Sequence, residues 1–421
     1  MTALHEVHEL AEPLAPGRAD VPVLGPNKAV EVARELGARF AAGSAERDRR
    51  RLLPTEQLEQ LSASGLLAVT VPREYGGADL SAETLAEVVR LVAAGDPNVA
   101  QIPHSHFVYV NVLREQGTAS QKERLFGDVL GGARFGNAQS EIRSKHVRDH
   151  ATTLRPLGPR IGSGPARAAE WVLDGSKGYC TGALFAHWIP VLAHLDEDGP
   201  LHVAWVERNA PGVTVIDDWD GVGQRTTASG TVRLDQVRVP SDLITPYYLT
   251  FERPQTFGAF AQLLHAAIDA GIARAALADA AEFVTTRSRP YPDAEVERAA
   301  DDPLVVHAFG EIELQVRTAE ALLAEAGRAV DRANDDLNDS TAGQASLAVA
   351  AARAAATTAS VDAGSRLFEV CGTRSALASL VLDRHWRNAR THTLHDPAGW
   401  KVQHLGRYAI DGTLPPRHGQ V

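Results

Sequence analysis

The sequence predicts a mostly helical α+β protein with an N-terminal α-helical domain, a middle β-barrel-like domain and a C-terminal four-helix bundle. The first observation is the length of 421 residues, which suggests two or three packed domains rather than one core. The second is the hydrophobic period, which is helical at both ends of the chain and changes to a strand-and-turn pattern between them. These changes place a flexible N-terminal arm at 1–26, the helical domain at 27–133, the β-domain at 134–245 and the bundle at 246–421.

Helix start and stop signals organise the N-terminal part. The residues before 27 are rich in Pro, Gly and Ala, which is typical of a loose arm. Thr55 can cap a helix in which Leu58 and Leu61 lie one turn apart. Ser81 then predicts the start of a second helix, which Gly95 ends. We therefore expect an all-helical domain here.

The middle part has the pattern of short strands. Residues 171–173 and 177–181 predict two strands joined by a tight turn at Asp174–Gly175. Residues 189–195 and 201–206 predict a second hairpin, with an acidic, glycine-containing turn between them. This spacing indicates a compact β-domain.

The C-terminal part returns to the helical period in long, alanine-rich segments. Asp302 followed by Pro303 is a good helix start. The apolar positions after it recur at i+3, i+4 and i+7 and are Val305, Phe309, Ile312, Val316 and Leu323. With the segments 257–288 and 341–371, this pattern predicts a bundle of closely packed helices.

Composition excludes several classes of function. The chain has 42 Lys and Arg against 53 Asp and Glu, so its formal charge of −11 argues against nucleic acid or an anionic membrane as a partner. Its most apolar helical stretches, 257–280 and 344–370, contain Asp or Arg and predict buried bundle helices rather than membrane spans. The two cysteines, Cys180 and Cys371, lack CxxC spacing, and the N-terminus lacks the apolar core of a signal peptide. We expect a cytoplasmic protein.

Four segments resemble a known family. Residues 136–141 (Gly-Asn-Ala-Gln-Ser-Glu) lie where acyl-CoA dehydrogenases carry an Ala-Leu-Thr-Glu-type flavin motif, and residues 174–181 resemble their Asn-Gly-x-Lys…Trp-Ile-Thr strand pair. Residues 383–397 are similar to the signature of dibenzothiophene-monooxygenase-like enzymes, and residues 179–188 to a subgroup called sulfur-acquisition oxidoreductases. The resemblance covers nearly the whole chain after the N-terminal arm, and it implies the acyl-CoA dehydrogenase fold.

The resemblance also implies an activity. It points to an FMNH2-dependent monooxygenase that oxidises a small organosulfur compound with O2 through a C4a-(hydro)peroxyflavin, in sulfur acquisition, and to a homotetramer. FAD is the alternative cofactor. Neither a GxGxxG motif after a strand nor a P-loop appears in the sequence, so we expect a separate NAD(P)H-dependent flavin reductase to supply reduced flavin. An acyl-CoA dehydrogenase with a displaced base, a nitrogen-oxidising monooxygenase and a non-catalytic flavin-binding scaffold remain as alternatives.

The main catalytic candidate follows from a missing carboxylate. Acyl-CoA dehydrogenation needs a base to take the α-proton, and most of the family carries it in a Tyr-Glu-Gly turn, which corresponds here to Leu394–His395–Asp396. Residues 257–268, where other members place the base, contain no acidic residue, and Asp396 precedes Pro397 as a turn residue would. An imidazole exchanges protons near neutral pH, so we predict that His395 replaces the base as a proton carrier.

Other histidines are weaker candidates. By resemblance, His106 faces the flavin from the N-terminal domain, and His104 and Tyr109 line the pocket. His392 lies three residues before His395, so the two share a face if the segment is helical, and we expect His392 to contact the cofactor. A histidine that only fills the core or a helix end is the alternative for each. No motif supplies a matched set of ligands, so we predict no metal site.

The resemblance also assigns the flavin contacts. Thr181 matches the Thr of Trp-Ile-Thr and is expected at the flavin N5, and Ser140 matches the Thr of the first motif and is expected at the pyrimidine edge. Asn137 is a catalytic candidate that projects toward the oxygen or the substrate, and Trp219 walls the ring system.

The flavin phosphate needs cations. Arg289 and Arg374 match phosphate-binding positions that in this family commonly come from a neighbouring subunit. Ordinary surface arginines are the alternative.

Overall fold

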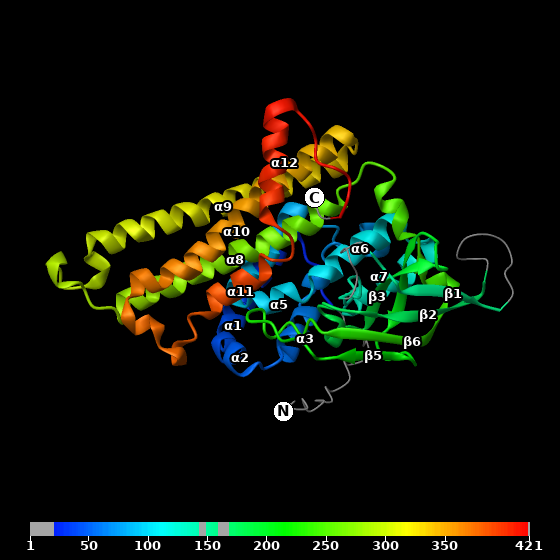
Figure 1. Cartoon of the computed structure of the whole chain (residues 1–421), viewed down its shortest axis with the longest axis horizontal. Coiled ribbons are helices and arrows are strands. Elements are labelled where there is room, and N and C mark those ends of the chain that lie inside the picture. Colours follow the sequence, from blue (N-terminus) through cyan, green and yellow to red (C-terminus); the bar gives the residue numbers. More distant parts are fainter. Residues whose placement is uncertain (1–20, 143–148, 159–167, 420–421) are drawn as a thin grey trace.

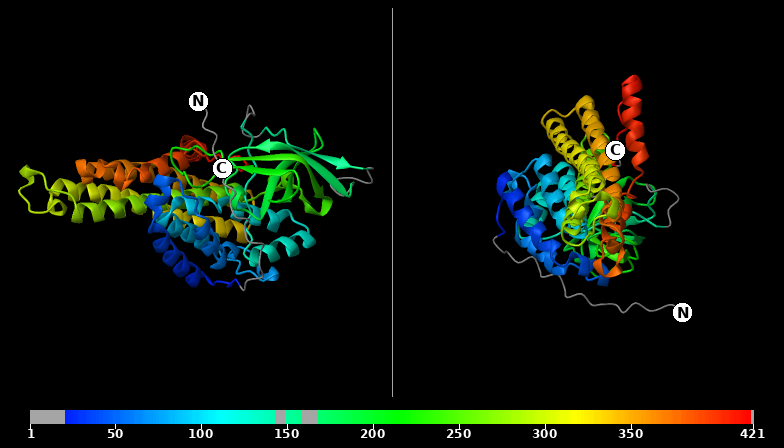
Figure 2. Two further views of the ribbon diagram at one scale, coloured as in Figure 1. Left: turned by 90° about the horizontal axis from the view of Figure 1, so that it is seen from below. Right: turned by 90° about the vertical axis from the view of Figure 1, so that its left-hand side faces the viewer.

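The computed structural model describes residues 21–142, 149–158 and 168–419. It has an N-terminal group of helices, a middle sheet and a C-terminal group of long helices, which confirms the predicted fold class. The long helices and the sheet lie at opposite ends of the molecule, with the N-terminal helices packed beside both (Figure 1; Figure 2, left).

Side-chain caps start some of the N-terminal helices, but the prediction of a cap at Thr55 is wrong, because Thr55 is the first residue of its helix and Pro54 precedes it without a capping hydrogen bond. Ser81 caps α4 by accepting a hydrogen bond from the backbone N–H of Thr84, and Asp96 caps α5 in the same way through Asn98. Both starts therefore depend on local chemistry. The helices are α1 (Pro26–Ala41), α2 (Ser44–Arg50), α3 (Thr55–Ala63), α4 (Ala82–Gly95), α5 (Pro97–Gln101), α6 (His104–Gln116) and α7 (Ala119–Leu130).

The middle part is a seven-stranded sheet. Its strands are β1 (Thr153–Leu157), β2 (Glu170–Lys177), β3 (Trp188–Leu195), β4 (Leu201–Glu207), β5 (Val213–Ile216), β6 (Thr231–Pro240) and β7 (Ile244–Thr245). The spatial order is β5-β6-β2-β1-β3-β4-β7. The predicted hairpin between β3 and β4 is confirmed, since Trp188 pairs with Glu207 and the register runs to the turn without a break.

The predicted turn at Asp174–Gly175 is wrong. Both residues lie inside β2, which runs through them and pairs with β6. The irregularity is a bulge on the partner strand: Leu173 pairs with Val237 and Gly175 with Leu234, so Asp174 faces two residues. The Asp174 carboxylate accepts a hydrogen bond of 2.8 Å from the backbone N–H of Gln236, which has a φ of 52°. The Asp-Gly pair thus holds a bulge and not a hairpin.

The C-terminal part is built on three long helices. They are α8 (Phe257–Thr286), α9 (Pro303–Asp335) and α10 (Asp339–Cys371), followed by the shorter α11 (Arg384–His392) and α12 (Ala398–Asp411). Asp302 caps α9 as predicted. Helix α8 is buried on all sides along most of its length because α4, α9, α10 and α11 all pack against it. Gly271 permits this closeness, since a Cβ atom there would lie 2.6 Å from the Ala93 side chain on α4.

Two hydrophobic cores join the three parts. One unites the N-terminal helices with α8, α9 and α10, and the other unites α6 and α7 with the sheet. The N-terminal helices therefore form a wedge between bundle and sheet, and the segments that meet there come from all three parts. Among the described residues, no helix combines the length and the apolar character needed to cross a membrane.

Candidate active site

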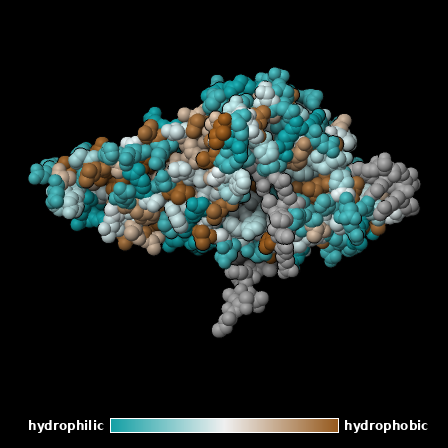
Figure 3. Space-filling model, turned by 45° about the horizontal axis from the view of Figure 1, so that its top comes forward, coloured by the Kyte–Doolittle hydropathy of each residue, from teal (hydrophilic) through white to brown (hydrophobic). Residues whose placement is uncertain are grey.

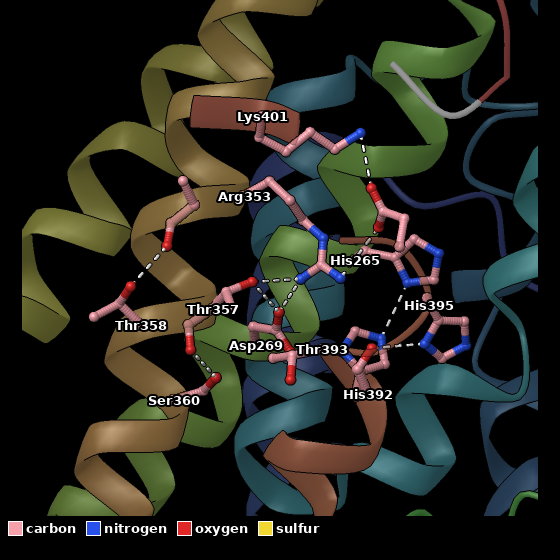
Figure 4. A network of polar contacts seen from close by, with 12 residues as sticks. His265, Asp269, Arg353, Thr357, Thr358, Ser360, His392, Thr393, His395 and Lys401 are labelled. Carbon is pink, nitrogen blue, oxygen red and sulfur yellow. Dashed lines mark hydrogen bonds and ion pairs between the residues drawn. The ribbon is translucent and has the colours of Figure 1, made fainter. Parts of the chain in front are cut away.

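Four imidazole rings gather where the three parts meet. We use the term histidine cluster for His104 at the start of α6, His265 on α8, His392 at the end of α11 and His395 in the turn that follows. The rings of His104 and His265 stack with centroids 4.0 Å apart. The His395 ring lies 4.6 Å from that of His265 and 4.9 Å from that of His392. Figure 4 shows the last three rings turned toward one another.

Hydrogen bonds fix how these rings carry their protons. His395 Nδ1 donates to the backbone carbonyl of His392 at 2.7 Å, so its Nε2 is free to accept a hydrogen bond from the side-chain amide of Gln101 at 3.1 Å. The amide oxygen of Gln101 then lies 3.2 Å from His392 Nε2. Gln101, the last residue of α5, thus bridges the two histidines of the C-terminal segment.

A buried ion pair between Asp269 and Arg353 holds one ring of the histidine cluster. His392 Nδ1 donates to Asp269 at 2.5 Å, and Arg353 on α10 forms an ion pair with the same carboxylate. The side chains of Asp269 and Arg353 are 0% and 1% exposed. Burial alone would raise the pKa of Asp269, but Arg353 and then His392 outweigh it, so the pKa is lowered. Asp269 is therefore an ionised group that holds the His392 ring in one orientation.

Asp396 is also paired. One of its carboxylate oxygens lies 2.8 Å from Lys401 Nζ, and the other lies 3.5 Å from an Arg353 nitrogen. Asp396 and Asp269 thus both neutralise buried cations. Neither carboxylate stands as an unpaired base for the removal of an α-proton.

The rings around this ion pair favour the neutral state. Desolvation lowers the pKa of His104 to about 4, and desolvation together with His104 lowers that of His265 well below its ordinary value. Desolvation and then His392 also lower the pKa of His395 to about 3. His395 is exposed on one side, so solvent opposes this last shift and only its direction matters for the chemistry.

The β-domain contributes a row of hydroxyl groups. Thr181, Ser229 and Thr227 are buried. The Ser229 hydroxyl oxygen lies 2.7 Å from that of Thr181 and also 2.7 Å from that of Thr227. The next residue, Gly182, has a φ of 79°, and a Cβ atom on it would lie 2.8 Å from the carbonyl oxygen of Ile102. Because Ile102 follows Gln101 directly, this close approach places the hydroxyl row next to the side chain that bridges the histidine cluster.

The loop between β5 and β6 makes further contacts across the same junction. The backbone N–H of Gln224 donates to Asn388 on α11 at 2.7 Å, and that of Gly223 donates to Thr391 at 3.0 Å. The backbone N–H of Thr226 donates to Asn98 on α5 at 3.2 Å. The surface of the β-domain and the histidine cluster are therefore held together by hydrogen bonds from both sides.

The first flavin motif lies on this surface too. The backbone carbonyl of Ser140 accepts a hydrogen bond of 2.9 Å from Gly178, and the Asn137 amide donates to the carbonyl of Tyr179 at 3.4 Å. Asn137 and Ser140 thus both contact the segment 178–179, which precedes Thr181 in the sequence. Trp219 lies beside them, with its ring 6.3 Å from that of Tyr179 and its N–H bound to the carbonyl of Gln224.

His106 lies outside the cluster. It is fully buried, and its Nε2 donates to the carbonyl of Leu67 at 2.8 Å while its Nδ1 accepts from the backbone N–H of Phe135 at 3.0 Å. These two bonds tie the helical domain to the start of the β-domain, which is a structural role. His104, which the resemblance assigns only to the pocket lining, is the histidine of α6 that faces the histidine cluster. Tyr109 is buried and packs edge-on to Trp205, away from the cluster.

The two predicted phosphate-binding arginines lie far from the cluster in the same chain. Arg289 follows the end of α8 and Arg374 follows the end of α10, and both are exposed. Since α8 continues for 21 residues from His265 to Thr286, its rise of about 1.5 Å per residue puts this end roughly 30 Å away. Only a neighbouring subunit can bring these arginines to a flavin beside the cluster.

Sequence reasoning missed four residues of the site, namely Gln101, His265, Asp269 and Arg353. A signal for two of them was present, because His265 and Asp269 are polar residues one helical turn apart in an otherwise apolar segment. Asp269 directly follows the segment 257–268, in which some members of the family place the base.

The residues present fit a flavin. Its ring system carries N–H and C=O groups that need partners, and several buried polar atoms here have none among the described residues: Asn137 Oδ1, Thr226 Oγ1 and both amide atoms of Gln224. A metal ion is also compatible with the donors, since one nitrogen each of His265, His392 and His395 lie within 4.8 Å of one another.

Comparisons with known proteins agree with this geometry. The chain matches the acyl-CoA dehydrogenase N-terminal domain over residues 28–133, the middle domain over 161–237 and the C-terminal domain over 263–398. It is 33% identical to dibenzothiophene monooxygenase of Rhodococcus qingshengii, over 92% of this chain and 94% of the relative. It is 31% identical to the probable FMNH2-dependent monooxygenase SfnC of Pseudomonas putida, over 93% and 96%. The crystal structure of FMN-bound TdsC from Paenibacillus sp. A11-2 superposes with a TM-score of 0.86 at 31% identity, over 93% of this chain and 100% of that chain.

Proposed function

Because the chain belongs to the acyl-CoA dehydrogenase family, and within it to the group that contains dibenzothiophene monooxygenases, we propose that it is an FMNH2-dependent monooxygenase that oxidises a small organosulfur compound for sulfur acquisition. One observation carries the proposal. Where a dehydrogenase needs an unpaired carboxylate, this site presents neutral imidazoles, and its two carboxylates, Asp269 and Asp396, are bound to cations. Such a site can exchange protons but has no free anion to remove an α-proton.

The hydroxyl row and its neighbours hold the flavin in this proposal. Bound reduced flavin supplies the electrons that activate dioxygen. Thr181 and Ser140 bind the polar edge of the ring system, and Trp219 covers it from the side. The buried carbonyl oxygen of Asn137, which has no partner among the described residues, orients the oxygen or the substrate.

His395 is the proton carrier. The carbonyl of His392 keeps the proton on Nδ1, so Nε2 is the atom that takes up and returns a proton. The Gln101 side-chain amide holds His395 Nε2 in place at 3.1 Å. His392, whose ring is oriented by Asp269, contacts the cofactor. The chain thus supplies a positioned proton, while sulfur acts as the nucleophile.

The proposal includes two kinds of partner. Reduced FMN comes from a separate NAD(P)H-dependent reductase, and both proteins act in the cytoplasm; two buried free cysteines support a reducing compartment. The chain also assembles as a homotetramer, because the distant arginines need a neighbouring flavin. Apolar side chains support this assembly, since Trp400, Val402 and Ile410 on α12 are exposed. Apolar groups also lie among hydrophilic ones along the bundle surface (Figure 3).

Stopped-flow spectroscopy tests the function. The protein is mixed with chemically reduced FMN and oxygen, and absorbance is followed with and without an organosulfur substrate. We expect a long-lived transient that is neither reduced nor oxidised FMN, and a stoichiometric sulfoxide or related product. His395→Gln should slow the decay of this transient, whereas His385→Gln, a change of a buried histidine on α11 that pairs with Asp279, should not.

The alternatives give other results. Reduction of bound FAD by an acyl-CoA, without a reductase, would replace the oxygenase assignment with a dehydrogenase. Immediate release of free peroxide with every substrate would indicate a flavin-binding scaffold. Oxidation of amines in preference to sulfides would move the assignment to nitrogen.

A further inference from the structure

Three nitrogen atoms of the histidine cluster, one each from His265, His392 and His395, converge on one space. In His392 and His395, Nδ1 is committed as a donor, to Asp269 at 2.5 Å and to a backbone carbonyl at 2.7 Å. Their Nε2 atoms therefore face inward. His265 Nδ1 completes the set at 3.1 Å from His392 Nε2.

This convergence calls for a positive charge. His265 Nδ1 and His392 Nε2 lie 3.1 Å apart, so one proton between them joins these two rings. Such a proton serves only two of the rings, and His395 Nε2 accepts only from the Gln101 side-chain amide. A cation with several coordination positions satisfies all three nitrogens at once.

We propose that His265, His392 and His395 form a binding site for a divalent transition-metal ion of the zinc class. Imidazole nitrogen is a preferred ligand of such ions. The bond between His392 and Asp269 reproduces the arrangement in which a carboxylate orients a metal-binding histidine and makes it more basic. Arg353 keeps that carboxylate ionised within the core.

The geometry is near to what such an ion needs. Zinc–nitrogen bonds of about 2.0–2.1 Å in a tetrahedral site separate the ligand nitrogens by roughly 3.3–3.4 Å. The His265 and His392 nitrogens already lie 3.1 Å apart, and all three lie within 4.8 Å. His395 closes the remaining gap, because it lies in the turn after α11 and not within the helix.

The site has an open side and a fourth donor. His395 is exposed, so an ion has a route from solvent. The amide oxygen of Gln101, 3.2 Å from His392 Nε2, lies where a fourth ligand is needed, and water is the alternative. Three nitrogens with an exchangeable fourth position describe a site that binds reversibly.

Metal binding has a consequence for turnover, and this consequence rests on the proposed function. The ion occupies Nε2 of His395, the atom that we assign to proton transfer, so it inhibits oxygenation. Binding itself does not depend on that assignment. The two claims therefore fail separately.

Titration with Zn²⁺ tests the site in the purified flavin-free chain and again with FMN bound. Calorimetry near neutral pH should show one ion per chain. Co²⁺ serves as a spectroscopic probe, since a nitrogen-ligated ion absorbs visible light more strongly than the hydrated ion. His395→Gln and His265→Gln should each weaken Zn²⁺ binding at least tenfold, and Asp269→Asn should weaken it about 10–100-fold.

His385→Gln is the matched control. His385 is also buried on α11 and also pairs with an aspartate of α8, but no metal-compatible group among the described residues includes it. It should leave Zn²⁺ affinity unchanged. The proposal is overturned if the wild-type chain binds no Zn²⁺ near neutral pH, or if His395→Gln binds it as tightly as the wild type does. Binding without inhibition would keep the metal site and remove His395 from the proposed proton transfer.

Discussion

The replacement Asp269→Asn tests whether the core of the site is held by charge. Asparagine is nearly the same size and its oxygen can still accept a hydrogen bond from His392. What disappears is the negative charge that neutralises Arg353, whose side chain is 1% exposed. Removal of one partner of a buried pair costs about 3–5 kcal/mol, because the remaining charge is left uncompensated. Because Asp396 remains 3.5 Å from Arg353, we expect a loss at the lower end of this range, about 3 kcal/mol, in the free energy of unfolding.

A second aspartate on the same helix provides the control. Asp279 binds Arg384 and His385 of α11, so the two sites have the same chemical composition. However, the Asp279 side chain is 32% exposed, and water can solvate the cation that remains after Asp279→Asn. Its pKa is lowered to about 2, chiefly by His385 and then by Arg384 against the opposing effect of burial. Allowing for solvent screening, we expect this variant to lose only about 1–2 kcal/mol.

Urea denaturation followed by circular dichroism measures the two losses. The slope of the transition should stay constant, so that a change in midpoint reports stability. The combined variant with Asp269→Leu and Arg353→Met should recover much of the loss, since it removes both buried charges together. If Asp269→Asn is no less stable than Asp279→Asn, charge compensation does not hold the site together and this reasoning is refuted.

Three further predictions concern the β-domain face of the site. Glu141→Gln removes the partner of the fully buried Lys177. Burial alone would raise the pKa of Glu141, but the hydrogen bond from Lys177 and the neighbouring donors lower this pKa from 4.5 to about 2. A carboxyl group whose pKa is lowered by folding stabilises the fold at any pH above its ordinary pKa. The variant should therefore lose about 2 kcal/mol of stability at neutral pH, with allowance for solvent screening. Denaturation at several pH values should show this difference shrinking as the pH falls from about 4.5 to about 2. Thr181→Val should weaken FMN binding roughly threefold to tenfold in a fluorescence titration, and unchanged affinity would remove Thr181 from the flavin site. Gly182→Ala should lower stability by more than about 1 kcal/mol in thermal unfolding, because of its positive φ and the contact with Ile102, and an unshifted midpoint would contradict this.

Elements that depend on local chemistry could be predicted from the sequence. Ser81 and Asp302 begin helices because each side chain caps its own first turn, and the β3–β4 hairpin needs only two strands and the turn between them. The turn at Asp174–Gly175 could not be excluded in this way. Its sequence fits a hairpin, and the pairing with β6, some sixty residues along the chain, decides that it is a continuous strand beside a bulge.

The choice between His104 and His106 shows the same limit. Successive residues of an α-helix are about 100° apart, so two residues separated by one other point to nearly opposite sides. The motif indicates that a histidine of α6 faces the site but not which one. The packing of α6 against α8 turns His104 toward His265 and His106 toward Leu67 and Phe135.

By itself, the sequence determined the three-part fold and the absence of an acidic residue from 257–268, and it predicts roles for His395 and Thr181, because these follow from period, composition and short motifs. The tertiary structure alone decided what surrounds His395. Its partners His265, Asp269 and Arg353 belong to helices whose contacts join residues 84 to 127 positions apart. Such contacts leave no local pattern, since a buried charge on one helix is stabilised only by the helix that packs against it.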